Sequence, residues 1–200
     1  MTNCIDVAET LKPILGHPSP DPAVYRTLDD TSQRVLAIFC VVHSQINVPE
    51  VNSTLLGPDL DIRLYETVPS AVKIVVPTSP GKHYMVFNGM TPNDDAESEF
   101  NDWYTEEHIP MLSVAPGWRS SNRFRVISTA ATSSDSSSAV ASPPQYMALH
   151  EWSSLDVFES AEFKAATTTS WRTKVVMEQV NKKERYLLEY VGTIQDLART

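Results

Sequence analysis

Short apolar runs separated by turn-forming residues dominate the chain and predict an α+β fold. Residues 35–42 are continuously apolar and rich in β-branched side chains, which is typical of a buried strand. Residues 61–68 alternate between apolar and polar positions, as a half-buried strand does. Further strands are expected at residues 84–88, 122–128, 146–152 and 185–191, with helices at about 155–163 and 171–181.

A longer helix is expected between the strands at 84–88 and 122–128. Residues 91–95 form a turn and an acidic N-terminal cap, which suits the exposed N–H groups and the dipole of a helix start. The pattern predicts that the helix ends at His108 or Pro110, because proline disfavours helical geometry in the residue before it.

The second half of the chain thus reads β-α-β-β-α-β, the order of a ferredoxin-like unit. Residues 128–144 within it are almost entirely Ser, Ala, Thr and Pro, and are predicted to be a disordered insertion. The first half resembles a degenerate copy, with residues 25–27, 35–42 and 64–68 corresponding to 124–126, 146–152 and 187–191. We therefore expect a degenerate half at 1–78 and a complete half at 79–200.

The start of the first half adds little to this division. Residues 5–15 have the pattern of a short amphipathic helix, and residues 76–81 resemble a connector between the halves.

Charge and composition narrow the classes of partner. The 200 residues carry a formal net charge of −9, which argues against a nucleic-acid-binding or anionic-membrane surface. No apolar run is long enough for a transmembrane helix, and the N-terminus lacks the features of a signal peptide. The two cysteines do not form a disulfide framework, so a cytoplasmic location is expected.

The predicted helix at 95–110 carries the main candidate chemistry. Asn101, Tyr104 and His108 recur at i, i+3 and i+7 and are expected to share one face. Phe100 and Trp103 lie on a neighbouring stripe that is most simply core. His108 has two possible roles. Its side chain either caps the helix end, where the dipole favours its charged form, or acts as a general acid/base at a pocket.

Two strands add candidates with their own alternatives. On strand 146–152, Met147 and Leu149 are expected to face the helices, which places His150 on the opposite face as a polar site residue or as a structural histidine. On strand 122–128, Arg125 is expected either to bind a carboxylate or phenolate inside a cavity or to be solvated at the surface. Asn88, beside a glycine, is a candidate for orienting a polar group.

Other chemistries find little support in the sequence. No P-loop, dinucleotide fingerprint, C-x-x-C or H-E-x-x-H motif is present, and no compact metal-ligand cluster is visible. We therefore expect no metal site of these kinds; that no cofactor is needed is what the family resemblance described next implies.

Three segments together resemble a known family. F-N-D-W-Y-x-x-E-H-I-P at residues 100–110, A-P-G-W at 115–118 and R-F-R at 123–125 resemble the EthD-like branch of the dimeric α/β-barrel superfamily. Residues 146–152 are similar to its third strand. Fungal members are often tandem fusions, so the resemblance implies a pseudo-dimeric barrel within one chain. The first half lacks the W-Y-x-x-E-H-x-P pattern, which implies a single site of this type.

The resemblance also implies a function, that of a cofactor-independent enzyme of fungal secondary metabolism. Its substrate would be a small aromatic or polyketide-like molecule, decarboxylated or cyclised by proton transfer through His108. The residues expected to help are Tyr104, Asn101 and His150 for orientation, Arg125 and Asn88 for polar contacts, and Trp103, Trp118 and Phe87 as apolar walls. The alternative is a non-catalytic protein that binds a hydrophobic metabolite or assists another enzyme. A homodimer through an exposed sheet edge is compatible with either.

Overall fold

A computed structural model describes residues 22–28, 36–39, 60–69, 82–132 and 142–197. These residues form one antiparallel sheet of seven strands in the order β2-β1-β7-β4-β6-β5-β3, with helices alongside, which is an α+β fold. The strands are β1 (Ala23–Thr27), β2 (Leu36–Phe39), β3 (Leu60–Thr67), β4 (Tyr84–Pro92), β5 (Trp118–Thr132), β6 (Tyr146–Trp152) and β7 (Val180–Thr193).

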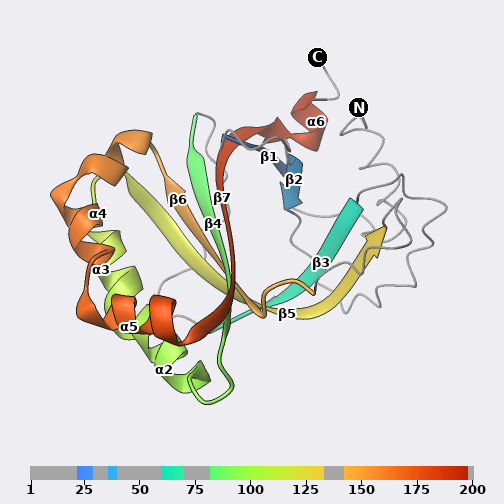
Figure 1. Cartoon of the computed structure of the whole chain (residues 1–200). Helices are drawn as coiled ribbons and strands as arrows, with labels where there is room; N and C mark the ends of the chain where they lie inside the picture. The colour runs from blue at the N-terminus through green and yellow to red at the C-terminus, as the bar shows by residue number, and fades with distance from the viewer. Residues whose placement is uncertain (1–21, 29–35, 40–59, 70–81, 133–141, 198–200) are drawn as a thin grey trace.

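Helices α2 to α5 gather on one face of the sheet (Figure 1). The helical segments are α2 (Glu97–Asp102), the π-helical η1 (Trp103–His108), α3 (Ile109–Ser113), the 3₁₀-helical η2 (Leu155–Glu159), α4 (Ala161–Ala166), α5 (Ser170–Glu178) and α6 (Ile194–Leu197). Three of them begin with a hydroxyl cap, because Ser154, Ser160 and Thr169 each accept a hydrogen bond from a backbone N–H in the following turn.

The second half has the predicted order of elements. Its four strands run β7-β4-β6-β5 in the sheet, and each helical stretch connects two of them. The predicted insertion at 128–144 is partly wrong, because β5 continues to Thr132 and pairs with β3 as far as Leu60. Residues 133–141 of that insertion, the expected helix at 5–15 and the connector at 76–81 lie outside the described residues.

The predicted helix end at His108 or Pro110 is wrong. The helical path runs through η1 into α3, and the backbone N–H of Ile109 donates to the carbonyl of Tyr104, five residues earlier. Pro110 lies in the first turn of α3, directly after this wide turn, where the regular pattern of helical hydrogen bonds is already interrupted. Ile109 and Leu112 are buried, and their burial favours continuing the helix.

Both faces of the central strand β6 are buried, and the predicted orientation of β6 is wrong. Tyr146 and Ala148 pack with residues of α2, η1 and α5, whereas Met147 and Leu149 pack with Tyr25 and other residues of β1, β4 and β7. His150 therefore lies on the helix-covered face, and Met147 and Leu149 lie on the concave face. All seven residues of β6 are buried, so hydrophobicity alone did not indicate which set faces the helices.

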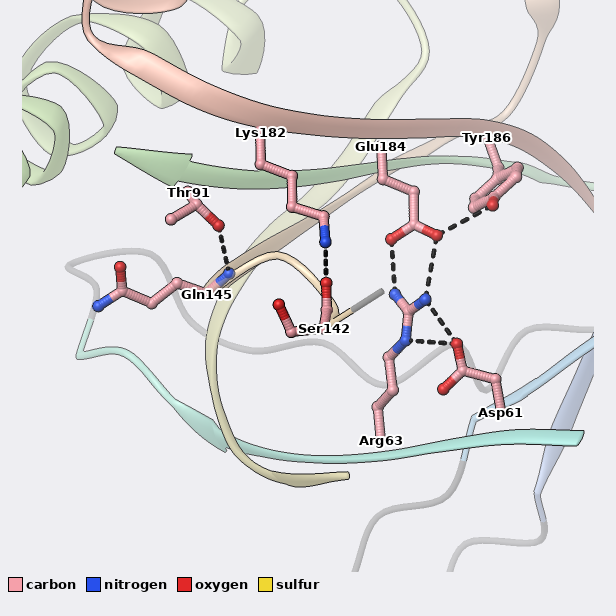
Figure 2. A network of polar contacts seen from close by, with 8 residues as sticks. All are labelled: Asp61, Arg63, Thr91, Ser142, Gln145, Lys182, Glu184 and Tyr186. Carbon is pink, nitrogen blue, oxygen red and sulfur yellow. Dashed lines mark hydrogen bonds and ion pairs between the residues drawn. The ribbon is translucent and has the colours of Figure 1, made fainter. Parts of the chain in front are cut away.

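The sheet curls until its edge strand β3 reaches across to β7. Arg63 on β3 binds Glu184 on β7 through two bonds of 2.6 and 3.0 Å, and it also binds Asp61 (Figure 2). The hydroxyl of Tyr186 donates to the same Glu184 (Figure 2). Strands β3 and β7 are not hydrogen-bonded neighbours, so this cluster fixes the curvature that encloses the concave core.

Replacing Arg63 with methionine is expected to lower the free energy of unfolding by about 1–3 kcal/mol, because Glu184 would remain half-buried without its partner. The matched control is Arg26→Met. Arg26 is 63% exposed, and its partner Glu189 keeps a second cation in Lys82. Urea unfolding of both variants measures the difference, and equal losses would contradict the proposed closure.

Candidate active site

The π-helical segment η1 brings three aromatic side chains together. A turn closed by i to i+5 bonds places residues five apart over one another, and Trp103 stacks on His108 with ring centroids 4.5 Å apart. Tyr104 meets His108 edge-on at 5.5 Å. All three are buried, His108 with only 6% of its surface exposed. Wide turns of this kind are frequent at functional sites.

Strand β6 supplies a second imidazole that faces this segment. The ring of His150 lies 5.8 Å from that of His108, at an interplanar angle of 87°, and 6.4 Å from that of Tyr104. On the neighbouring strand β5, Ser121 Oγ lies 2.8 Å from His150 Nδ1, and the indole N–H of Trp118 donates to Ser121 Oγ over 3.0 Å. The site therefore lies between the first helical stretch and the sheet.

Arg123 brings a positive charge into the same region. Its guanidinium lies 4.2 Å from the ring centroid of Tyr104, and its Nη2 donates to Asn101 Oδ1 over 2.8 Å. Asn101 in turn donates to the backbone of Glu97. Arg123 is only 4% exposed, yet no carboxylate among the described residues forms an ion pair with it. A buried cation without a counter-ion is costly and is a natural binding point for an anion.

Burial keeps the titratable groups of the site neutral, apart from the arginine. Burial lowers the pKa of His150 to about 3, and the charges of Arg123 and Arg185 act in the same direction. Burial, followed by His150 and Arg172, also lowers the pKa of His108 well below its usual range. Burial raises the pKa of Tyr104 to about 12, against the opposing effect of Arg123. Near neutral pH the site thus holds two neutral imidazoles beside a cation.

Four buried polar atoms of this region have no hydrogen-bond partner. They are His108 Nδ1, His150 Nε2, Trp103 Nε1 and Arg123 Nε. Buried polar atoms are usually paired, because leaving one unpaired costs about 1–3 kcal/mol. The concentration of such atoms around two imidazoles marks a place where the polar groups of a ligand, or ordered water, can complete the hydrogen bonding.

The structure brings together only part of the predicted residue set. Asn101 lies half-buried and reaches the site through its hydrogen bond with Arg123. Arg125, on the same strand as Arg123, is exposed. Asn88 on β4 pairs with Ala148 and shares the helix-covered face, without a hydrogen bond to the imidazoles. Phe87 packs in the concave core instead. His108 does not cap its own helix, which continues into α3. Its ring instead hydrogen-bonds the backbone of Ala166 at the end of α4, and its lowered pKa is opposite to the charged form expected at a helix end.

Arg123 and Ser121 are the site residues that the sequence analysis missed. Arg123 and Arg125 share one face of β5, and the sequence pattern alone does not indicate which of them faces a cavity. The A-P-G-W segment before the strand offered one clue, because Trp118 lies three residues before Ser121 and hydrogen-bonds to it.

Acid is expected to destabilise the fold through these two histidines. In the unfolded chain each titrates near pH ~6.5, so as the pH falls below that value the unfolded state takes up protons that the folded state rejects. The free energy of unfolding should fall by up to about 1.4 kcal/mol per pH unit per histidine, down to the folded pKa, which is about 3 for His150. Burial raises the pKa of Glu151, which acts in the opposite direction.

Urea unfolding at ~pH 7 and ~pH 5 measures this loss. A His150→Gln variant should show a shallower dependence on pH than the wild-type protein. Identical slopes in the two proteins would contradict the burial of a neutral His150.

Two further findings concern metal binding and membrane crossing. Within the described residues, no group of three or more His, Cys, Asp or Glu side chains is placed to hold a metal ion. None of the helices in that part of the chain has the length and apolar character to cross a bilayer.

Comparison with known proteins gives a fold relationship. No protein-family model matches the chain, and no curated protein matches its sequence. The solved structure of an anthrone oxidase-like protein resembles it with a TM-score of 0.54 and 13% sequence identity, covering 96% of this chain and 87% of that one. At this identity the similarity establishes a shared fold, which agrees with the curled α+β sheet described above.

Proposed function

We propose that the chain is a cofactor-independent enzyme that removes a proton from an enolisable carbon of an aromatic, polyketide-like substrate, with His108 as the base. The observation that carries the proposal is the set of four unpartnered polar atoms around the two neutral imidazoles. A neutral imidazole has a free lone pair, which is what a general base requires. The resemblance to EthD-like proteins supports the same class of substrate.

The proposed step is a proton transfer with a balanced movement of electrons. His108 Nδ1 takes a proton from carbon, and the electrons of the C–H bond move into an enolate whose charge resides on the former carbonyl oxygen. Arg123 offers an unpaired N–H and a positive charge for that oxyanion. The developing negative charge also raises the proton affinity of His108, which offsets the lowering of its pKa by burial.

The lowered pKa of His108 favours removal of a proton from the substrate over decarboxylation. Protonating an aromatic ring to release CO₂ requires an imidazolium at the outset, and the lowered pKa of His108 disfavours that form. Removing a proton that is already acidic, such as one between two carbonyl groups, requires only the neutral base. A cyclisation that begins with an enolate fits the site better than a decarboxylation.

The second candidate function is non-catalytic binding of a hydrophobic phenolic metabolite. It is favoured by the same pKa values, because an imidazole whose pKa is about 3, as for His150, is a weak base near neutral pH. In that case the unpaired polar atoms would hold the ligand without moving a proton.

Deuterium exchange separates the two functions. Anthrone is a suitable probe, because its methylene group lies between two aromatic rings conjugated with a ketone, and the fold neighbour is anthrone oxidase-like. The enzyme should accelerate exchange of that methylene in D₂O without oxygen, as followed by NMR. Quenching of tryptophan fluorescence without faster exchange would favour the binding protein, and absence of both would argue against either function for this class of ligand.

The N-terminal strands support the further proposal of a tandem pseudo-dimeric barrel. If residues 25–27 and 64–68 correspond to 124–126 and 187–191, then Arg26 matches Arg125 and Glu66 matches Glu189. In the sheet Arg26 pairs with Glu189, and Arg125 pairs with Glu66. This reciprocal register is what two copies related by a twofold axis produce.

A further inference from the structure

Ser121 occupies a position between the indole of Trp118 and the imidazole of His150. It lies on β5 with no exposed surface. Its Oγ lies 3.0 Å from Trp118 Nε1 and 2.8 Å from His150 Nδ1. The adjacent Ser120 faces the other side of the sheet and donates to Glu151 over 2.9 Å.

The direction of each hydrogen bond follows from what the groups can donate. An indole N–H is only a donor, so Ser121 Oγ accepts from Trp118. The serine proton then needs an acceptor, and among the described residues that acceptor is His150 Nδ1. With its lone pair used at Nδ1, the neutral ring carries its proton on Nε2.

We propose that Ser121, held by Trp118, is a positioning residue that presents His150 to the substrate as an Nε2–H donor. This rests on the function proposed above, and it makes His150 a hydrogen-bond donor to the substrate oxygen. His150 Nε2 is the buried atom left without a partner, as such a role requires. Trp118 thereby acts through Ser121, in addition to packing.

The two imidazoles then offer complementary groups. The ring of His108 donates to the backbone carbonyl of Ala166, and Nδ1 is the nitrogen without a partner, so His108 offers a lone pair there. His150 offers a proton from a ring 5.8 Å away. The pair suits an enolisable ketone, including one whose acidic C–H is conjugated to the carbonyl through an aromatic ring, with the oxygen at His150 and the C–H at His108.

The first test is the protonation of His150 in the free protein, which does not depend on turnover. Side-chain ¹⁵N NMR distinguishes protonated from unprotonated ring nitrogens, and the His150→Gln variant assigns the signals. The wild-type protein should show an unprotonated Nδ1 and a protonated Nε2. Ser121→Ala should shift the ring toward a mixture of the two neutral forms, whereas the matched control Ser120→Ala should leave it unchanged.

The second test is the rate of deuterium exchange of the anthrone probe. Ser121→Ala should lower kcat about tenfold, the effect of losing one well-placed hydrogen bond, with a smaller change in KM. Ser121→Thr keeps the hydroxyl and should recover most of the rate. Trp118→Phe should have a smaller effect than Ser121→Ala, because the serine can still donate to His150.

The outcomes separate this proposal from the proposed function. A proton on Nδ1 of His150 in the wild-type protein would overturn the role of Ser121, even if the protein catalyses exchange. So would a Ser121→Ala variant with unchanged ring protonation and kcat. The expected protonation, altered by Ser121→Ala in a protein that catalyses no exchange, would support the positioning of His150 and refute the catalytic function.

Discussion

Replacing His108 with glutamine is expected to lower the rate of carbon-acid deuterium exchange by about 10²–10⁴-fold, the usual contribution of a general base. Glutamine retains hydrogen-bonding capacity in the buried site but lacks a basic nitrogen. Because His108 stacks on Trp103 inside the protein, the larger cavity left by alanine would confuse loss of packing with loss of the base. Binding of the probe, followed by tryptophan fluorescence, should be largely retained.

His83 provides a matched control for this substitution. It is also fully buried and stacked on an aromatic ring, that of Tyr190, with centroids 4.3 Å apart, but it lies beside Tyr25 of the concave core. His83→Gln should therefore cost stability without a comparable loss of kcat. Full activity in His108→Gln would refute the assignment of His108 as the base.

Replacing Arg123 with methionine should abolish most of the activity while changing the free energy of unfolding by less than about 2 kcal/mol. Activity falls because the enolate loses its buried positive charge, a loss of about 10²-fold or more in kcat. Stability changes little because two terms oppose each other. The cation–π contacts and the bond to Asn101 are lost, but so is the cost of burying an arginine without a carboxylate partner.

Arg125→Met is the control for Arg123→Met. The two arginines lie two residues apart on β5 and face the same side, but Arg125 is exposed. Its replacement should leave both kcat and stability nearly unchanged. A larger loss of activity in Arg125→Met than in Arg123→Met would restore the original expectation that Arg125 binds the anion.

Much of the fold could be predicted because its elements depend on local patterns. Each strand expected in residues 84–191 is present, although β5 and β7 are longer than their apolar segments. Their C-terminal ends extend to pair with strands of the first half, and their N-terminal ends pair with β6 and β4. The segment with Trp103, Tyr104 and His108 was also identified, because so many polar and aromatic groups at helical spacing are unusual for a core helix. Its wide turn was missed, since hydrogen bonding over five residues leaves no distinct pattern in a sequence.

The sequence by itself determined the order of the elements and the helical segment that carries the candidate base. The tertiary structure decided which face of β6 meets that segment and which arginine of β5 is buried. The first decision depends on packing from two sides: every residue of β6 is buried, so alternation along the strand does not distinguish the helix-covered face from the concave one. The second depends on how far the helices cover β5, because the two arginines share a face and Arg123 packs against Phe100 and Tyr104. Only the packing of Tyr146 and Ala148 against the helices settles that His150 faces His108.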